Sequence, residues 1–240
     1  MANQNRAGMM DEIRCDEKDY LIWKWRPANN VRRENAIRWG SSLRVREGSV
    51  AVFICRRKGR DAIQEFIEGP FDEALNTSNL PIIASFVAAA YGGGTPFQAE
   101  VYFINLAKVV QSRFAVRYFD VFDQRFPDFG VPVAVRGTLT FQIADYREFI
   151  ELHRPDEFTL EDFQSQVRDA VSRRVKSLVA NMPSKLGIPL LQLAGRTDDL
   201  SELANNDLSP QLRKVFGIEL TSLDLSLIHI SEPTRPLYIS

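Results

Sequence analysis

The stretch that decides the fold runs from Val131 to Ala180 and reads "VPVAVRGTLTFQIADYREFIELHRPDEFTLEDFQSQVRDAVSRRVKSLVA". In its first part apolar and polar residues alternate, which is typical of a strand with one buried face. After Thr159 the apolar residues recur at steps of three and four, which is typical of an amphipathic helix. The period therefore changes within one stretch, and the sequence predicts a sheet-rich part followed by a helical part.

On the N-terminal side of this stretch, from Tyr20 to about Thr140, short apolar runs are separated by Gly, Pro and charged turns. Runs such as "SVAVFICRR", "DAIQEFI", "FQAEVYFINL" and "FAVRYFDVFD" predict strands and hairpins, including a turn at Glu47-Gly48 between "SSLRV" and "SVAVFICRR". The run "PIIASFVAAAY" fits either a short buried helix or a strand, and we favour a helix over Pro81–Tyr91.

The helical part begins with a short predicted helix from Asp145 to Leu152. Thr159 and Asp162 form a capping-box-like start for a long helix, and Pro183 marks its expected end. A loop is expected over 184–199, followed by a helical piece around "SPQLRKVFG" with Gly217 as its C-cap and a last apolar run, "IELTSLDLS". The predicted buried face of the long helix comprises Leu160, Phe163, Val167, Val171, Val175 and Leu178.

Composition limits the classes of function. The chain has 240 residues, 45% of them apolar, and a formal net charge of -1, which disfavours binding to nucleic acid or anionic membranes through overall charge. The basic clusters Arg56–Arg60 and Ser172–Lys176 are interpreted as solvated surface.

Cys15 and Cys55 lack the spacing of a disulfide framework or zinc site, so a reducing cytoplasm is expected. We expect no secretion signal, and the apolar window Leu80–Gly94 is too short to span a bilayer.

Three consecutive glycines, Gly92, Gly93 and Gly94, raise the question of a phosphate-binding loop. Such a loop leads into a helix N-terminus and is followed by Lys and Ser or Thr, whereas this one leads through Thr95-Pro96 into the alternating run "FQAEVYF". The context favours a tight turn before a strand over a nucleotide site.

The titratable residues do not form a catalytic set. His153 lies at a predicted helix end, where a solvated or C-capping role is favoured, and His229 lies near the C-terminus. The carboxylates Asp120, Asp123 and Asp128 are interleaved with aromatic residues and fit turns at strand ends better than a metal or acid–base site. We therefore expect no catalytic, cofactor-binding or metal-binding residues.

The order of several segments resembles the SPFH (Band 7) superfamily, which includes stomatin-, prohibitin- and flotillin-like proteins. The segments are "NAIRWGSSLRVREGSVAVFI", "EFIEGPFDEAL", "YGGGTPFQAEVYFIN", "YFDVFDQRFPDFGVPVAVRGTLTFQIADYREFIELH" and "EDFQSQVRDAVSRRVKSLVA". Within that superfamily the chain resembles a soluble bacterial branch often labelled virion-core-protein-like. The resemblance implies an α+β fold: a bent, mostly antiparallel sheet with packed helices, followed by a helical subdomain.

The resemblance also implies a division of the chain. Residues 1–19 form an N-terminal arm, and 20–226 form the SPFH domain, with a sheet-rich part over about 20–145 and a helical part with a final strand over about 146–226. The last segment, "SLIHISEPTRPLYIS", resembles translated adapter or vector DNA, so 227–240 are expected to be a non-native tail. Relatives continue with a coiled-coil-prone region and a zinc ribbon or peptide-binding module. Without them, the chain is expected to be a monomer or small oligomer.

The function implied by the resemblance is that of a non-enzymatic, oligomeric scaffold at the cytoplasmic face of a bacterial membrane. It would organise a separately encoded membrane-protein partner in envelope stress or membrane organisation, without a cofactor and without nucleic acid. No apolar anchor precedes Tyr20, so attachment is expected through that partner or through an exposed apolar face within Pro81–Tyr91. The alternatives are a nucleotide- or phosphate-binding enzyme that uses the Gly92–Gly94 loop, and a soluble peptide-binding adaptor.

Overall fold

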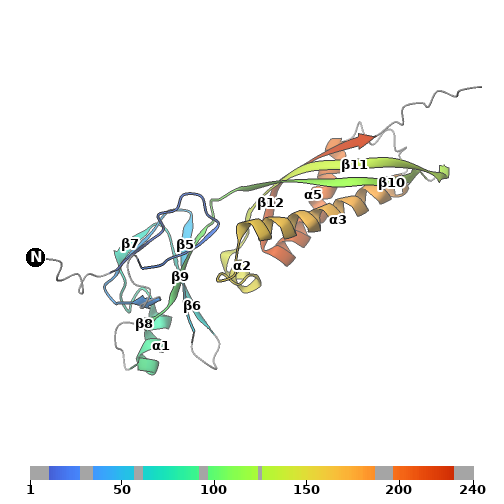
Figure 1. Ribbon diagram of the computed structural model, residues 1–240. Helices are drawn as coiled ribbons and strands as arrows, with labels where there is room; N and C mark the ends of the chain where they lie inside the picture. Colours follow the sequence, from blue (N-terminus) through green and yellow to red (C-terminus); the bar gives the residue numbers. More distant parts are fainter. Residues whose placement is uncertain are drawn as a thin grey trace, which may run out of the picture. The chain divides into compact units, whose positions relative to one another are not determined.

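The computed structural model describes residues 11–27, 35–56, 62–91, 97–123, 126–186 and 197–229. It has an α+β fold divided into two compact units (Figure 1). Unit 1 comprises Met1–Lys108 together with Arg154–Phe158, and unit 2 comprises Val109–His153 together with Thr159–Ser240. The chain thus passes between the units three times, and each unit has its own strand pairing and its own core.

Unit 1 contains short strands and one helix. The four-stranded sheet has the order β2-β9-β5-β6, the three-stranded sheet the order β1-β4-β7, and β3 pairs with β8. All pairs are antiparallel except the parallel pair β1 and β4. The elements are β1 (Glu12–Arg14), β2 (Ile22–Lys24), β3 (Ala36–Ile37), β4 (Ser42–Val45), β5 (Ser49–Cys55), β6 (Ile63–Glu68), β7 (Phe71–Ala74), α1 (Pro81–Tyr91), β8 (Phe97–Gln98) and β9 (Glu100–Asn105).

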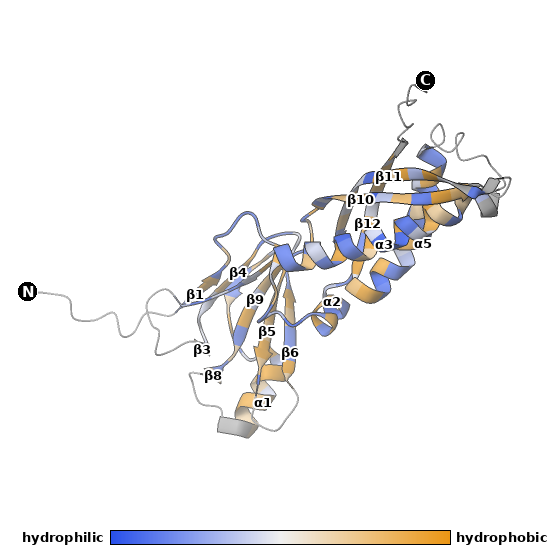
Figure 2. Cartoon of the chain, turned by 45° about the vertical axis from the view of Figure 1, so that its right-hand side comes forward, coloured by the Kyte–Doolittle hydropathy of each residue, from blue (hydrophilic) through white to orange (hydrophobic). Residues whose placement is uncertain are grey.

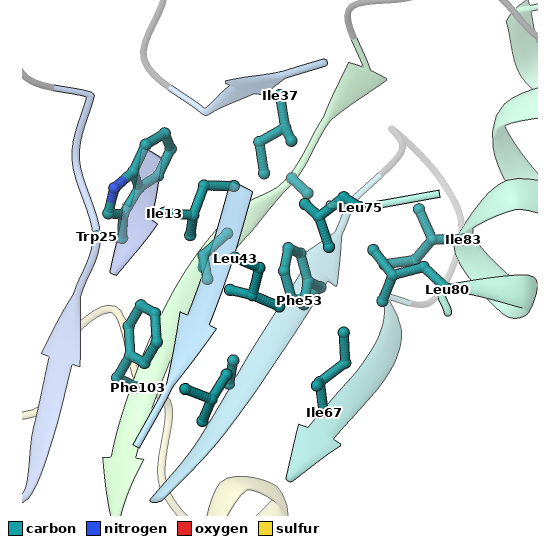
Figure 3. Close-up of a cluster of buried hydrophobic side chains, with 14 of the residues drawn as sticks. Ile13, Trp25, Ile37, Leu43, Phe53, Ile67, Leu75, Leu80, Ile83 and Phe103 are labelled. Carbon is teal, nitrogen blue, oxygen red and sulfur yellow. The ribbon is translucent and has the colours of Figure 1, made fainter. Parts of the chain in front are cut away.

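The core of unit 1 forms where its sheets meet (Figure 3). Leu43 of β4 and Phe53 of β5 are both fully buried in one apolar cluster, which Phe103 of β9 joins. Every residue of β5 is buried, as its unbroken apolar sequence "SVAVFIC" requires, because a strand with an apolar residue at nearly every position must be covered on both faces.

One predicted hairpin is wrong. The strands on either side of Glu47-Gly48 do not pair with each other: β4 pairs with β1 and β7, whereas β5 pairs with β6 and β9. The turn instead carries the chain from one sheet to the other, with Gly48 at a φ of 71°. A Cβ atom at Gly48 would lie 3.0 Å from Cβ of Ala107, so both conformation and space favour glycine there.

Unit 2 is a three-stranded antiparallel sheet covered on one face by helices. Helix α3 packs on β10 and helix α5 on β12, and the two helices contact each other, so both lie on the same face (Figure 1). The sheet has the order β10-β11-β12. The elements are β10 (Val110–Asp123), β11 (Phe126–Ile143), α2 (Tyr146–Leu152), α3 (Leu160–Leu186), α5 (Thr197–Phe216) and β12 (Ile218–His229).

The alternation read from the sequence sets the two faces of this sheet. On β11, Val133, Val135, Leu139 and Phe141 are buried, whereas Arg136 between them is exposed. Both neighbouring ladders are irregular: the pairing of β10 with β11 shifts register between Val116 and Phe119 and again after Phe122, and that of β11 with β12 shifts between Thr140 and Phe141. An extra residue at such a point reverses which side chains face the helices, and this restores burial of the apolar residues beyond it.

The helices of unit 2 have the predicted spacing of buried residues, but some of their first and last residues differ from the predicted ones. The predicted helix at Asp145–Leu152 forms as α2 from Tyr146, and Asp145 is its N-cap, where its side chain accepts hydrogen bonds from the backbone N–H groups of Arg147 and Glu148. Helix α3 continues through Pro183 to Leu186, because a proline in the last turns removes a single donor and leaves the bonds of later residues intact. Its buried face continues at Val179, which is fully buried, rather than at Leu178.

The last helix and strand are both longer than expected. Helix α5 begins at Thr197, inside the predicted loop, and buries residues at every fourth position: Leu200, Ala204, Leu208, Leu212 and Phe216. Gly217 follows with a φ of 65°, as its C-cap role requires. Strand β12 extends to His229, where it pairs with β11, so three residues beyond Ser226 lie in the sheet. Residues 230–240 of the predicted tail lie outside the described residues, and the division at 226 stays a prediction.

Candidate interaction surface on helix α1

Helix α1 is a strongly apolar element of unit 1. Its eleven residues, "PIIASFVAAAY", include no charged side chain, and Figure 2 shows the helix largely in orange. Pro81 occupies its first position, where a missing backbone N–H costs no intrahelical bond and the fixed φ favours the helix. The sequence prediction of a helix over Pro81–Tyr91 is confirmed.

One face of α1 is docked on the core of unit 1. Ile83 and Val87 are buried there, at a spacing of four residues, and Leu80 just before the helix is also buried. Figure 3 shows Leu80 and Ile83 in the same cluster as Ile67 of β6. Because buried apolar residues recur on one face only, the helix lies along the surface and is not enclosed as a buried helix would be.

A buried carboxylate fixes the start of this helix. The side chain of Glu65 on β6 accepts hydrogen bonds from the backbone N–H groups of Ile82 at 3.1 Å and Ile83 at 2.9 Å. Glu65 is only 7% exposed. The first turn of a helix has no internal partners for its N–H groups, and the helix dipole favours a negative charge there. Glu65 therefore links the sheet to the orientation of α1.

The sequence contains a sign of the role of Glu65 that the prediction of "DAIQEFI" as a strand did not use. Glu65 shares one face of β6 with Ile63 and Ile67, so a carboxylate interrupts an apolar alternation. A buried charge at such a position requires donors nearby. Its charge also adds to the effect of burial, the larger cause, in raising the pKa of the Cys55 thiol to about 12.

The outer face of α1 is uncovered. Ile82 has 54% of its surface exposed, and Ala88 and Ala89 are exposed as well. The hydroxyl of Ser85 donates to the carbonyl of Pro81 at 2.9 Å, so the one polar side chain described on this face is satisfied within the helix. We call the exposed residues Pro81, Ile82, Ser85, Ala88 and Ala89 the α1 outer face.

The candidate catalytic, metal-binding and phosphate-binding residues considered from the sequence lie away from the α1 outer face or outside the described residues. Gly92–Gly94 are outside the described residues, as are the side chains of Asp123 and His229. Asp120 and Asp128 are exposed on β10 and β11. Within the described ranges, no group of three or more His, Cys, Asp or Glu residues is arranged to hold a metal ion.

His153 has a structural environment in unit 2. It follows α2 as its C-cap, and its ring packs against Phe149 and Phe163, with centroid distances of 4.7 and 5.1 Å. Its Nε2 lies 3.1 Å from the carbonyl oxygen of Phe216 at the end of α5. Burial lowers the pKa of His153, and the hydrogen bond to Phe216 partly opposes this.

Both predicted basic clusters contain an arginine that forms a structural ion pair. Arg56 lies 3.2 Å from Asp156 and 3.6 Å from Glu100 within unit 1. Arg174 of α3 forms two hydrogen bonds to Asp207 of α5, at 2.5 and 2.7 Å, and so joins the two helices of unit 2.

The comparisons with known proteins support the family read from the sequence. The model of the SPFH domain-Band 7 family matches residues 25–235, which is most of the chain. The chain belongs to this family. SPFH proteins are generally non-enzymatic scaffolds that associate with membranes and typically form homo-oligomers. The search of curated proteins gave no match. No helix in the described part of this SPFH chain combines the length and apolar character needed to cross a bilayer.

Proposed function

We propose that this chain is a non-enzymatic scaffold of the soluble bacterial, virion-core-protein-like branch of the SPFH family. It acts at the cytoplasmic face of a membrane and organises a separately encoded membrane protein, in envelope stress or membrane organisation. The observation that carries the proposal is the α1 outer face, an uncharged and exposed helix surface in a member of a membrane-associated family.

The size of the α1 outer face explains why a partner is part of the proposal. Full burial of an isoleucine side chain contributes about 1.5–3 kcal/mol, and Ile82 has 54% of its surface to bury. A gain of roughly 1 kcal/mol changes an equilibrium by less than about tenfold. A single copy would therefore bind lipid weakly, whereas a membrane-protein partner, or several copies held together, would make attachment stable.

Cell fractionation tests this proposal. The chain produced alone in bacteria is expected in the soluble fraction, and production together with the membrane proteins encoded beside its natural gene should move it to the membrane fraction. Ile82→Asp should reduce that shift, because it places a charge on the α1 outer face. Val215→Asp is the matched control, since Val215 is similarly exposed, at 57%, but lies on α5.

Two results would contradict the proposal. If the chain sediments with membranes when produced alone and resists carbonate extraction, attachment does not depend on a partner. If Ile82→Asp and Val215→Asp shift equally, the α1 outer face is not the contact.

The enzymatic alternative has a direct test of its own. Titration with ATP and GTP should show no saturable binding at micromolar concentrations. Saturable binding that Gly93→Val abolishes would favour a phosphate-binding loop at Gly92–Gly94 and remove the basis for a purely structural role. The adaptor alternative predicts recovery of soluble partners in a pull-down without membranes, and the scaffold proposal predicts that recovery needs the membrane fraction.

A further inference from the structure

The sheet of unit 2 leaves one face uncovered. Helices α3 and α5 cover the face that carries Val133 and Val135, and side chains on the opposite face alternate with these along the strands. We call this opposite side the open sheet face. Its exposed residues include Gln111, Arg113, Ala115, Arg117, Tyr118, Asp120 and Phe122 of β10, Arg136 of β11, and Glu219, Asp224 and Ser226 of β12.

Three arginines lie on the open sheet face, together with the exposed aromatic side chains Tyr118 and Phe122. The strand register places Arg113 beside Thr138, and it places Arg136 between Ala115 and Ser226. Across the part of the chain that the structure describes, no ion pair or hydrogen bond links Arg113, Arg117 or Arg136 to another side chain. Long cationic side chains without partners on an uncovered sheet suit an acidic surface on another molecule.

An acidic surface of suitable form lies on the outer side of α5. Asp198 and Glu202 are exposed and four residues apart, on the side of the helix opposite the buried Leu200 and Ala204. Like charges at this spacing repel each other by about 0.2–0.5 kcal/mol. The helix dipole accounts for an acid in the first turn, at Asp198, but it fades over the next turn, where Glu202 lies.

We propose that the open sheet face of one copy of this chain docks on the outer side of α5 of a second copy, with Arg113 and Arg136 facing Asp198 and Glu202. The two surfaces lie on opposite sides of one sheet-and-helix unit, so the contact is heterologous, and its repetition builds a ring or an open row of copies. This inference rests on the proposed function as an oligomeric scaffold, and it names the contact that the assembly uses.

The mixed charge of both surfaces favours a second copy over an anionic membrane. The open sheet face carries the carboxylates of Asp120, Glu219 and Asp224 as well as its arginines, and a lipid surface of uniform negative charge would repel them. The outer side of α5 is likewise mixed, because Arg213 and Lys214 are exposed near its C-terminal end. Each surface can therefore offer a partner of opposite sign to the other.

A charge-exchange experiment by sedimentation velocity tests the contact. At low ionic strength the wild-type chain should associate with increasing concentration, and about 1 M NaCl should reverse this by screening the pairs. The double variant Arg113→Glu/Arg136→Glu should associate at least about tenfold more weakly, and so should Asp198→Arg/Glu202→Arg. A 1:1 mixture of the two variants should associate again, because each supplies the surface that complements the other. The control Lys18→Glu/Arg173→Glu makes the same change in net charge at exposed positions elsewhere and should behave as wild type.

The outcomes separate this contact from the rest of the account. Wild-type protein that stays monomeric, variants that associate like wild type, or a mixture no more associated than its components would each overturn the proposal. So would loss of binding to phosphatidylglycerol vesicles in Arg113→Glu/Arg136→Glu with self-association intact, because the arginines would then face lipid. The fractionation of Ile82→Asp tests membrane attachment independently, so failure of one proposal does not imply failure of the other.

Discussion

Replacement of Glu65 by alanine should release helix α1 from the sheet. The change removes both acceptors for the backbone N–H groups of Ile82 and Ile83. The N–H of Ile83 is buried, and an unsatisfied buried donor costs about 1–3 kcal/mol. The N–H of Ile82 can find water more easily, and the favourable charge at the helix N-terminus is lost as well. We expect a total cost of about 2–4 kcal/mol for the docked state of α1.

Hydrogen exchange of the α1 amides measures this cost locally, which matters because a chain of two units need not unfold in a single step. A loss of 2–4 kcal/mol corresponds to exchange about 30- to 1000-fold faster in α1. Glu65→Gln keeps one carbonyl acceptor and should show an intermediate effect. Glu73→Ala, at an exposed position of β7, should leave α1 unchanged. Equal protection of α1 in Glu65→Ala and Glu73→Ala would refute the role assigned to the carboxylate.

Three further predictions concern unit 2. Val167→Asp should lower the free energy of unfolding by several kcal/mol because it buries an unpaired charge on the inner face of α3, whereas Arg173→Ala on the exposed side should lower it only slightly. Equal shifts in melting temperature for the two variants would show that the helix faces are misassigned. Gly137→Ala should destabilise the sheet by about 1–3 kcal/mol, since its Cβ would lie 2.7 Å from the ring of Phe114, and unchanged denaturant unfolding would contradict this packing. Because the pKa of His153 is lowered in the folded state, the unfolded state takes up a proton first as the pH falls. The contribution of neutral, buried His153 to stability is therefore fully present above about pH 6.5 and is lost as the pH falls below that value. His153→Gln should flatten the dependence of unfolding free energy on pH in this range, and a dependence identical to that of wild type would contradict the assignment.

Much of the fold could be predicted because its main elements have strong periodicity. The alternation around Val133–Ile143 predicted which face of β11 is buried, and the four-residue spacing from Phe163 to Val175 predicted the buried face of α3. The start of α5 was missed because "TDDLSELANND" is mostly polar, and only Leu200, Ala204 and Leu208 mark its buried side. Burial against β12 stabilises this segment as a helix, and that contact is not visible in a local window of sequence.

Strand partners and the candidate surface were harder to predict than the elements. The turn at Gly48 has the residues of a hairpin, yet β4 and β5 join different sheets, because pairing depends on which faces must be covered and not on the turn alone. Helix α1 and an exposed apolar face within Pro81–Tyr91 were expected, but the residues that form this face became evident only once Leu80 and Ile83 were placed in the core. The role of Glu65 depends on a contact 17 residues away in sequence.

Photo-crosslinking from the α1 outer face tests the central claim most directly. A benzoylphenylalanine placed at Ile82 in cells that carry the natural gene neighbourhood should form a crosslink that sediments with the membrane fraction, to lipid or to a membrane-embedded protein. The same probe at Val215, which is equally exposed on α5, should not. Crosslinks from Ile82 to soluble proteins alone, or membrane crosslinks from Val215 and none from Ile82, would contradict the account of this chain as a membrane-associated SPFH scaffold that uses α1.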